Sequence, residues 1–427
     1  MIRRLVCAAS ATVIVLLGLP PLGAAASAKP GCGATITRST TLTADVGPCT
    51  GDGLIVTANH VTLDLAGHRI FGATPESTSF VGVRLRNVSN VTVEGPGSVY
   101  RFAAGVAIVG GHGNILQGLD VHDNNSTQFS NDNPDLALFG DGIAVVASSY
   151  NLVTHNYVHG NGPFDGIGVF TFVFQGTHGP APEHNTITNN QVVDNSIPDV
   201  CLSNGTYFGG PCVPGEPVFS EDIGIRIEGP QADFNTLSGN SVSGSGRDGI
   251  SVLNAGGVTP MLDRNTNTMI SGNNSSGNGT AVVLTDPVVG KLGGDGVFNR
   301  CFAGSSPVGC PTLTTIVGNT VDDNPAHGIS LDASQGNVVL ANEASGNGFG
   351  NQTVYASDPP YTDGFDTNTN PNCDHNTWLG NSFGTVNQPC VRKHVPSAAS
   401  PSAASVAAVS PSSPVHQPPR PGGRATL

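Results

Sequence analysis

Apolar and polar residues alternate over short stretches of this chain, and the stretches recur. "DGIAVV" begins at Asp141, "DGIGVF" at Asp165 and "DGISVL" at Asp248. Alternation with a period of two predicts a β-strand that buries one of its faces. Helical spacing is not sustained anywhere in the sequence. The pattern therefore predicts an all-β protein made of short strands.

The strands belong to a longer repeat. "DGIAVVASSYNLVTHNYVHGNG" starts at Asp141, and "HGISLDASQGNVVLANEASGNG" starts at His327. Each unit holds an alternating strand, a turn, a second strand and an Asn/Gly-rich corner. Self-similarity at about 20–25 residues is typical of a solenoid, in which each unit buries its apolar face only against its neighbours. Coils stacked at about 4.8 Å would form long parallel sheets.

The corners have their own composition. The Gly that follows Asp in the repeat permits a positive φ or a close approach of another backbone. Asn at the same corner of successive coils can form hydrogen bonds to the coils above and below. The residues expected to form such a ladder are Asn114, Asn156, Asn235, Asn319 and Asn337.

These Asp-Gly-apolar repeats resemble those of secreted bacterial parallel β-helix repeat proteins. The resemblance covers roughly residues 50–390. It implies a right-handed parallel β-helix of the pectate-lyase type. That fold carries lyases, hydrolases, epimerases, phage tailspikes, a copper-binding family and proteins without known activity, so it leaves the chemistry open.

The two ends of the chain predict export. Arg3 and Arg4, the apolar run 13–19 and the small residues 26–28 have the layout of a signal peptide, and the run is too short to span a membrane. We expect a secreted protein, extracellular or in the cell wall or periplasm. The expected parts are a signal peptide (1–28), an N-terminal cap (29–53), the β-helix (54–369), a C-terminal cap (370–390) and a disordered Pro/Ser/Ala-rich tail (391–427).

Eight cysteines remain once Cys7 is removed with the signal peptide. Their connectivity cannot be deduced from sequence alone, and nearest-neighbour pairing is the simplest hypothesis. No C-x-x-C spacing is present, so no metal site is predicted. The expected disulfides are Cys32–Cys49, Cys201–Cys212, Cys301–Cys310 and Cys373–Cys390.

Charge narrows the range of partners. The chain has 17 Lys and Arg against 31 Asp and Glu, which disfavours nucleic acid and anionic membranes. No Lys or Arg lies between Arg101 and Arg226, whereas 11 of the 24 aromatic residues lie between Phe129 and Phe219. This favours a neutral or weakly charged extracellular polysaccharide as the partner. A polyuronate lyase would need Arg84 and Arg86 in the groove, or Ca²⁺ as a bridge.

Insertions that interrupt the repeat predict the functional face, because they emerge as loops beside the stacked strands. They fall at 126–140, 173–183, 200–220, 255–263 and 286–311. The candidate sugar-binding aromatic residues are Phe129, Phe139, Tyr157, Phe170, Phe172 and Tyr207. The candidate catalytic residues are His122, Asp123, Asp141, His159, Asp165 and Asp222.

Two of these carboxylates start neighbouring units of the repeat. If Asp141 and Asp165 begin adjacent coils, their separation is close to the ~5–5.5 Å of a retaining glycosidase, and the pair could also bind Ca²⁺. Alternatively, Asp before Gly only accepts backbone hydrogen bonds in a turn.

The leading hypothesis is a carbohydrate-active protein that binds and cleaves or modifies a polysaccharide. The alternatives are a non-enzymatic surface, structural or glycan-binding β-helix, and a polyuronate lyase or epimerase. The oligomeric state stays open.

Overall fold

The structure is a computed structural model, and the residues that it describes all belong to the unit Met1–His394, the first of two compact units. The described residues are 26–75, 80–126, 140–171, 173–174, 177–178, 181–200, 206–207, 210–211, 214–215, 217–218, 222–229, 231–254, 265–280, 294–301, 310–349, 361–367 and 373–391. No helix among them is long and apolar enough to cross a membrane.

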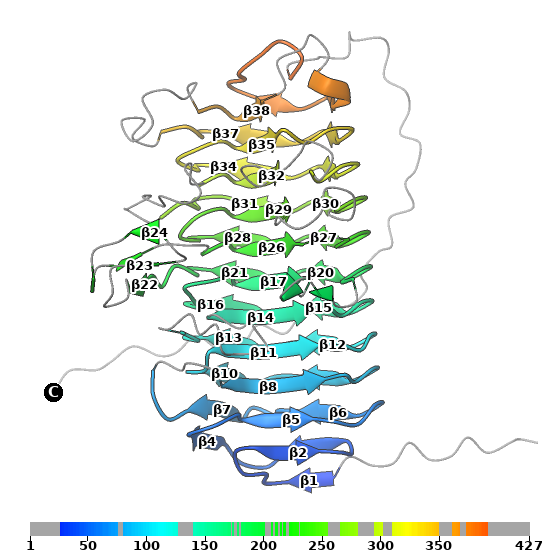
Figure 1. The fold of residues 1–427 in the computed structure, drawn as a ribbon, viewed down its shortest axis with the longest axis vertical. Coiled ribbons are helices and arrows are strands. Elements are labelled where there is room, and N and C mark those ends of the chain that lie inside the picture. Colours follow the sequence, from blue (N-terminus) through cyan, green and yellow to red (C-terminus); the bar gives the residue numbers. More distant parts are fainter. Residues whose placement is uncertain are drawn as a thin grey trace, which may run out of the picture. The chain divides into compact units, whose positions relative to one another are not determined.

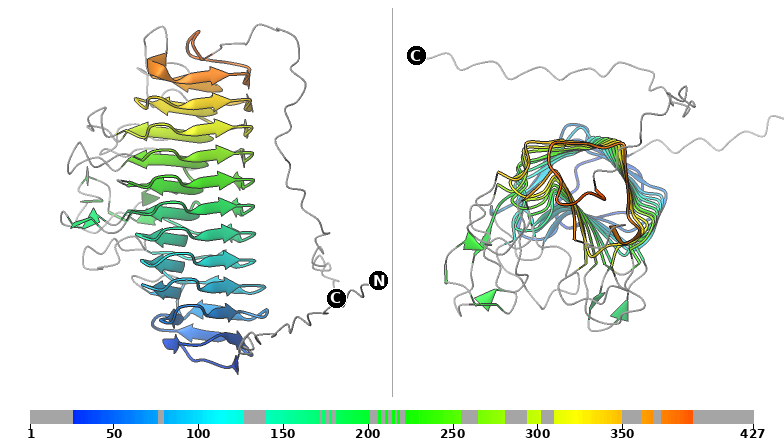
Figure 2. Two further views of the ribbon diagram at one scale, coloured as in Figure 1. Left: turned by 90° about the vertical axis from the view of Figure 1, so that its right-hand side faces the viewer. Right: turned by 90° about the horizontal axis from the view of Figure 1, so that it is seen from above.

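Three long parallel sheets run along the stack of coils (Figures 1 and 2). Each coil contributes one strand to sheet 1, the next to sheet 2 and the next to sheet 3, and each strand pairs with its equivalent in the following coil. This arrangement confirms the all-β solenoid predicted from the repeat.

The strand bounds are as follows. Sheet 1 contains β2 (Ala34–Ile36), β5 (Leu54–Val56), β8 (Val81–Arg86), β11 (Ala104–Val109), β14 (Asp141–Val146), β17 (Ile167–Phe170), β26 (Ile225–Glu228), β29 (Ile250–Asn254), β32 (Val297–Cys301), β35 (Ile329–Asp332) and β38 (Gly364–Asp366). Sheet 2 contains β1 (Ala26–Ala28), β3 (Thr40–Leu42), β6 (Thr62–Asp64), β9 (Thr92–Glu94), β12 (Ile115–Gln117), β15 (Leu152–Thr154), β20 (Thr186–Thr188), β27 (Thr236–Ser238), β30 (Met269–Ser271), β33 (Thr315–Val317), β36 (Val338–Leu340) and β39 (Thr377–Leu379). Sheet 3 contains β4 (Val46–Cys49), β7 (Arg69–Gly72), β10 (Ser98–Tyr100), β13 (Asp120–His122), β16 (Tyr157–His159), β21 (Gln191–Val193), β28 (Ser241–Ser243), β31 (Asn274–Ser275), β34 (Thr320–Asp322), β37 (Glu343–Ser345) and β40 (Ser382–Phe383).

Three two-stranded antiparallel sheets are additional to these. They fall within two of the predicted insertions, except that β22 begins one residue before the insertion at 200–220. They are β18 (Val173–Phe174) with β19 (Thr177–His178), β22 (Asp199–Val200) with β25 (Pro217–Val218), and β23 (Thr206–Tyr207) with β24 (Gly210–Pro211). A short 3₁₀ helix, η3, spans Cys373–His375. The other insertions lie wholly or mostly outside the described residues.

Alternation along each short strand builds the core. In sheet 2 the central residues Leu116, Val153 and Ile187 are in register and fully buried, while their flanking residues face outward. Each such side chain stabilises the fold by about 1.5–3 kcal/mol through burial. Because a coil buries these side chains only against its neighbours, the core is continuous along the stack.

Asparagine ladders connect the coils at three corners rather than one. In each ladder a side-chain carbonyl accepts hydrogen bonds from the preceding coil, as Asn151 Oδ1 does from the backbone N (3.0 Å) and Nδ2 (3.1 Å) of Asn114. The prediction of a ladder is confirmed, but its placement at a single corner was wrong. Asn114, Asn235 and Asn337 lie at the corner before sheet 2, and Asn156 and Asn319 lie at the corner before sheet 3.

The glycine of the repeated Asp-Gly phrase is needed for close approach. Gly142 and Gly166 do not have a positive φ. A Cβ on Gly142 would lie 2.7 Å from the carbonyl oxygen of Gly166, and a Cβ on Gly166 would lie 2.7 Å from that of Gly224. The phrase recurs because successive coils touch backbone to backbone at this position.

Replacing Gly166 by Ala is therefore expected to lower the free energy of unfolding by about 3 kcal/mol, the upper range for inserting one methyl group into a packed site. The new Cβ would meet a backbone oxygen, which cannot rotate away. Gly51→Ala is the matched control, because nothing lies within 4 Å of a Cβ there. Equilibrium denaturation would measure both variants, and equal stabilities would contradict the close-approach explanation.

Disulfides are found at both ends of the stack. Cys32–Cys49 and Cys373–Cys390 form as nearest-neighbour pairing predicts. Cys310 is also disulfide-bonded. Cys201 and Cys212 lie outside the described residues, as does the side chain of Cys301. Near the second disulfide, Trp378 is buried and donates a hydrogen bond from Nε1 to Asp366 Oδ2 (3.0 Å).

Candidate functional site

A row of stacked rings runs across the outward face of sheet 3. Phe71, Tyr100, His122 and His159 are in register on successive strands. Their ring centroids are 5.5, 4.8 and 5.0 Å apart, with interplanar angles of 10–13°. The residue before each ring is fully buried, so alternation directs the ring residue itself outward. We call this set the ring row.

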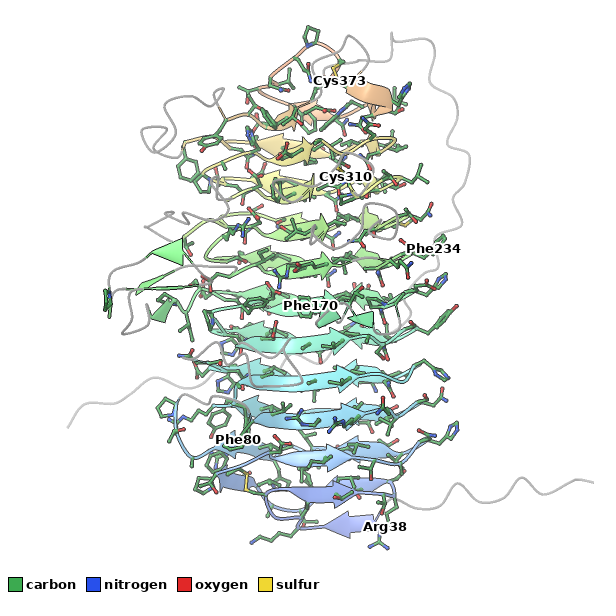
Figure 3. The ribbon with its side chains drawn as sticks, viewed as in Figure 1. Arg38, Phe80, Phe170, Phe234, Cys310 and Cys373 are labelled. Carbon is green, nitrogen blue, oxygen red and sulfur yellow. A yellow bond between two sulfur atoms is a disulfide. The ribbon has the colours of Figure 1, made fainter. Side chains whose placement is uncertain are left out.

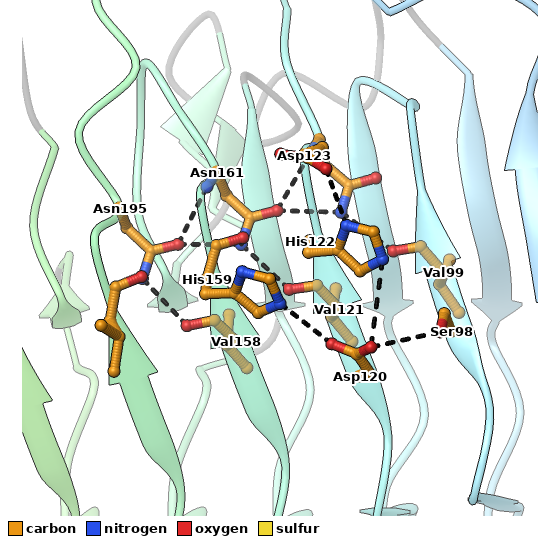
Figure 4. Close-up of polar contacts among 12 residues, drawn as sticks. Ser98, Val99, Asp120, Val121, His122, Asp123, Val158, His159, Asn161 and Asn195 are labelled. Atoms are coloured by element: carbon orange, nitrogen blue, oxygen red, sulfur yellow. Dashed lines mark hydrogen bonds and ion pairs between the residues drawn. The ribbon is translucent and has the colours of Figure 1, made fainter. Parts of the chain in front are cut away.

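Asp120 connects the two imidazoles at one end of the ring row (Figure 4). Its Oδ1 accepts a hydrogen bond from His159 Nε2 at 3.1 Å, and its Oδ2 lies 4.0 Å from His122 Nε2. Ser98 Oγ donates to Oδ2 at 3.2 Å. Asp120 and His122 are two residues apart on β13, so both face outward, and β16 brings His159 beside them.

His122 has a second carboxylate partner. Its Nδ1 donates to Asp123 Oδ2 at 2.8 Å, and Asp123 lies at an exposed corner with a φ of 51°. Carboxylates accept only, so Nδ1 of His122 and Nε2 of His159 must both carry protons. In the neutral imidazoles, His159 Nδ1 and His122 Nε2 are then left to accept a proton.

The environment of Asp120 favours its ionised form. Burial raises the pKa of this carboxyl group, but the hydrogen bond from His159 and the charges of His122 and His159 outweigh burial. The net pKa is below the usual value. The site therefore holds a carboxylate between two imidazoles, and the hydrogen bond to His159 Nε2 orients that ring.

This lowered pKa predicts a pH-dependent stability. Because the pKa of Asp120 is lower in the folded chain than in the unfolded chain, its ionised form stabilises the fold above about pH 4. This stabilisation is lost as the pH falls through the pKa that Asp120 has in the folded chain. The side chain is 42% exposed, so solvent screening limits the effect to below about 1 kcal/mol. The stability advantage of wild type over Asp120→Asn should shrink between about pH 5 and pH 3, where imidazole does not ordinarily titrate. Denaturation across this range measures it, and a constant difference would contradict the linkage.

Tyr157 is the predicted sugar-binding residue that belongs to this site. It precedes His159 by two residues on β16, and the two rings stack at 4.1 Å. Its exposed fraction is 40%, so its ring is accessible to a ligand beside the imidazoles.

Two arginines flank the other end of the ring row. Arg69 lies over the Phe71 ring at 5.8 Å and is ion-paired with Asp45. Arg101 lies over the Tyr100 ring at 5.7 Å and is exposed, and no carboxylate among the described residues forms an ion pair with it. Arg101 and Asp123 lie at the same corner of adjacent coils, and the backbone N–H of Arg101 donates to the Asp123 carbonyl at 3.1 Å.

The arginines named as markers of a polyuronate lyase lie elsewhere. Arg84 and Arg86 are on β8 of sheet 1, and Arg84 is largely buried in an ion pair with Asp52 at 2.9 Å. Neither residue lies on the sheet that carries the ring row.

Asp141 and Asp165 of the Asp-Gly phrase, and Asp222 of the related "DIGIRI", have no exposed surface. Asp141 and Asp165 do begin adjacent coils in register, since Ile143 pairs with Ile167. Asp165 is ion-paired with Arg226 at 2.9 Å. These three carboxylates are thus separated from solvent, unlike Asp123.

Elsewhere the same phrase holds the coils together. Asp248 Oδ1 accepts hydrogen bonds from the backbone N–H groups of Gly294 (2.8 Å) and Asp295 (3.0 Å). Asp295 Oδ1 accepts one from the N–H of His327 at 2.6 Å. In these coils the aspartate is an architectural acceptor of the backbone N–H groups of the next coil.

The remaining predicted aromatic residues are not part of the ring row. Phe170 is buried and packs, with Phe164, against the Arg226 guanidinium at 4.8 and 4.4 Å. Phe129, Phe139 and Phe172 lie outside the described residues, as does the side chain of Tyr207.

The catalytic and binding residues selected from the sequence did not include three contributors to the site, Asp120, Ser98 and Arg101. The available signal was the alternation in "LDVHDNNS", which sends Asp120 and His122 to the same face. Within the described part of the chain, no group of three or more His, Cys, Asp or Glu residues could hold a metal ion.

The family model for the right-handed β-helix region matches residues 29–259. The chain belongs to this right-handed β-helix family. No curated protein has a sequence that matches it.

Solved structures with similar coordinates share little sequence with this β-helix protein. A Dettilon tailspike protein is 15% identical with a TM-score of 0.49, covering 77% of this chain and 52% of the tailspike chain. Pectate lyase Pel9A is 13% identical with a TM-score of 0.39, covering 74% and 70%. The A-module of the Azotobacter vinelandii mannuronan C-5 epimerase AlgE4 is 15% identical with a TM-score of 0.39, covering 73% and 87%. The chain thus spans about half the length of the tailspike, and these similarities carry no information on activity.

Proposed function

We propose that this β-helix protein binds an extracellular polysaccharide along the outward face of sheet 3 and cleaves it by acid–base catalysis. The observation that carries the proposal is the 3.1 Å hydrogen bond between His159 Nε2 and Asp120 Oδ1, with the second imidazole, His122, stacked 5.0 Å away. A base oriented by a carboxylate, beside a second group that can return a proton, is the arrangement that bond cleavage by proton transfer requires.

The roles follow from the free ring nitrogens. Asp120 orients His159, whose Nδ1 accepts a proton from a water molecule that attacks the sugar. His122 in its protonated form donates a proton to the departing glycosidic oxygen, and Asp123 orients it through Nδ1. Imidazole exchanges protons near neutral pH, which suits both roles. Hydrolysis of a neutral glycan is the first candidate, because the chain has few cations.

Arg101 favours a second candidate reaction, elimination on a polyuronate. Its exposed guanidinium lies over the Tyr100 ring, next to His122 in the ring row. A guanidinium there would neutralise a uronate carboxylate while His159 removes the proton next to it. The electron pair would then form the double bond and expel the glycosidic oxygen, which takes its proton from His122.

The proposal includes export. Disulfides such as Cys32–Cys49 are typical of oxidising compartments. In the proposal, residues 1–28 are removed as a signal peptide, which takes β1 (Ala26–Ala28) from the end of sheet 2. The tail begins after Val391, because the Val391 side chain is buried in the core. The partner is an extracellular polysaccharide.

The test is a panel of neutral and uronate polysaccharides, incubated with the exported protein with and without Ca²⁺. New reducing ends on a neutral glycan, without ultraviolet absorbance of unsaturated sugars, support hydrolysis. Unsaturated products support elimination. Binding without products, or no effect on any glycan, overturns the catalytic proposal.

A further inference from the structure

A second set of stacked rings lies at a different corner, between sheets 1 and 2. Tyr150, His184 and Phe234 each precede a strand of sheet 2, and Phe234 projects from the edge of the stack that carries β27 (Figure 3). Tyr150 stacks on His184 at 4.8 Å and His184 on Phe234 at 4.9 Å, with interplanar angles of 10° and 5°. We call these three residues the aromatic corner.

The backbone at this corner does not favour aromatic residues. Tyr150, His184 and Phe234 have φ values of 60°, 57° and 55°, in the left-handed region that suits Gly and Asn. Gly and Asn do occupy the equivalent position in the coils on either side, as Gly113 and Asn267. The backbone therefore does not explain why three successive coils carry a ring here, since Leu313 has a φ of 57° at the same corner without a ring.

The rings are also poorly covered. The exposed fraction is 60% for Tyr150 and 46% for Phe234. Gly113 has no side chain to cover the Tyr150 face that points toward the preceding coil. Asn267 donates from Nδ2 to the neighbouring Thr266 Oγ1 at 3.0 Å. The stack therefore presents a ring face at each of its two ends.

The charges around the aromatic corner define the ligand. Glu183 and Asp233 each precede a ring residue and are partly exposed, so carboxylate oxygens accompany the rings. Asp233 Oδ1 accepts the Thr266 N–H at 2.6 Å, and burial raises the pKa of this carboxyl group. Across the described residues from 140 to 254, the cations are Arg226 and Arg247, and both are buried. An anionic ligand is thus disfavoured, whereas sugar hydroxyl groups can donate to the carboxylates.

We propose that the aromatic corner is a second binding site, which takes a neutral polysaccharide by stacking a sugar ring on the open face of Tyr150. A sugar ring offers an apolar face to the aromatic ring and hydroxyl groups to Glu183 and Asp233. The site lies at another corner from the ring row, and it holds the chain on the polysaccharide independently of cleavage.

The test is affinity electrophoresis of the exported protein in gels that contain soluble glucan or xylan, with alginate as the anionic comparison. The background variant Asp120→Asn, expected to slow cleavage by about 10²- to 10⁴-fold, is used in every sample. Tyr150→Asn and Phe234→Asn remove a ring and place at a left-handed position a residue that tolerates it, so the fold is retained. Leu313→Asn is the matched control, because Leu313 lies at the same corner with a φ of 57° and is exposed but stacks on no ring.

Retardation by a neutral glycan should be at least ten-fold weaker in Tyr150→Asn and Phe234→Asn and unchanged in Leu313→Asn. The thermal midpoints of the two ring variants should be unchanged or higher, since the substitution relieves backbone strain. Unaltered binding by Tyr150→Asn overturns the proposal, and so does retardation by alginate alone or by no glycan. A concentration-dependent dimer that Tyr150→Asn abolishes would also overturn it, because the corner would then join two copies of the chain.

Discussion

Replacing Asp120 by Asn is expected to lower the rate of polysaccharide cleavage by about 10²- to 10⁴-fold, the range of one general acid–base contribution. Asn has the same shape but no charge, and its amide can present an N–H group to His159, which already donates at this contact. His159 would then lose its orientation and its stabilising partner. Glycan binding should stay within about two-fold of wild type, because the rings of Tyr157 and Tyr100 are retained.

The control for this prediction is Asp322→Asn, an Asp-to-Asn change on β34 of the same sheet, where the side chain accepts from the N–H and Oγ of Ser345. It should leave the rate unchanged. His159→Gln is the second variant and should reduce cleavage as Asp120→Asn does, with circular dichroism to verify the fold. Full activity in both variants would place the chemistry elsewhere.

Replacing Asn190 by Ala is expected to lower the free energy of unfolding by about 4 kcal/mol, since several buried polar groups lose their partner at once. Asn190 is buried in the ladder before sheet 3. Its Oδ1 accepts from the backbone N and Nδ2 of Asn156, each at 3.0 Å. Its Nδ2 donates to Val153 O at 2.9 Å and to Asn240 Oδ1 at 3.0 Å.

The matched control is Asn189→Gly, one residue earlier. Asn189 is exposed with a φ of 55°, which Gly adopts without strain, so its effect should be within about 0.5 kcal/mol. Asn190→Asp should destabilise as well, because it keeps the acceptor but loses the donor. Denaturation by urea measures all three, and a mild effect of Asn190→Ala would mean that the coils do not depend on a continuous ladder.

The fold could be predicted because its causes are local and repeated. Alternation in "DGIAVV" fixes which side chains are buried, and the recurring Asn/Gly corner fixes where each coil turns. Nearest-neighbour pairing of Cys32 with Cys49 and of Cys373 with Cys390 could be predicted for the same reason, because the partners are only 17 residues apart in the sequence. The ladder was assigned to one corner because a repeat shows that Asn recurs, whereas the register between coils decides which Asn residues meet.

The residue pattern is enough to predict the stack of coils, and the composition is enough to show the acidic character that disfavours nucleic acid as a partner. The three-dimensional arrangement was needed to show that His159, 39 residues further along the chain, meets Asp120, because the insertion at 126–140 separates their coils. It also decided that Asp141 and Asp165 are buried while Asp123 is exposed. Burial of a side chain at a coil corner depends on which residues pack over that corner, and the repeat pattern does not predict those residues.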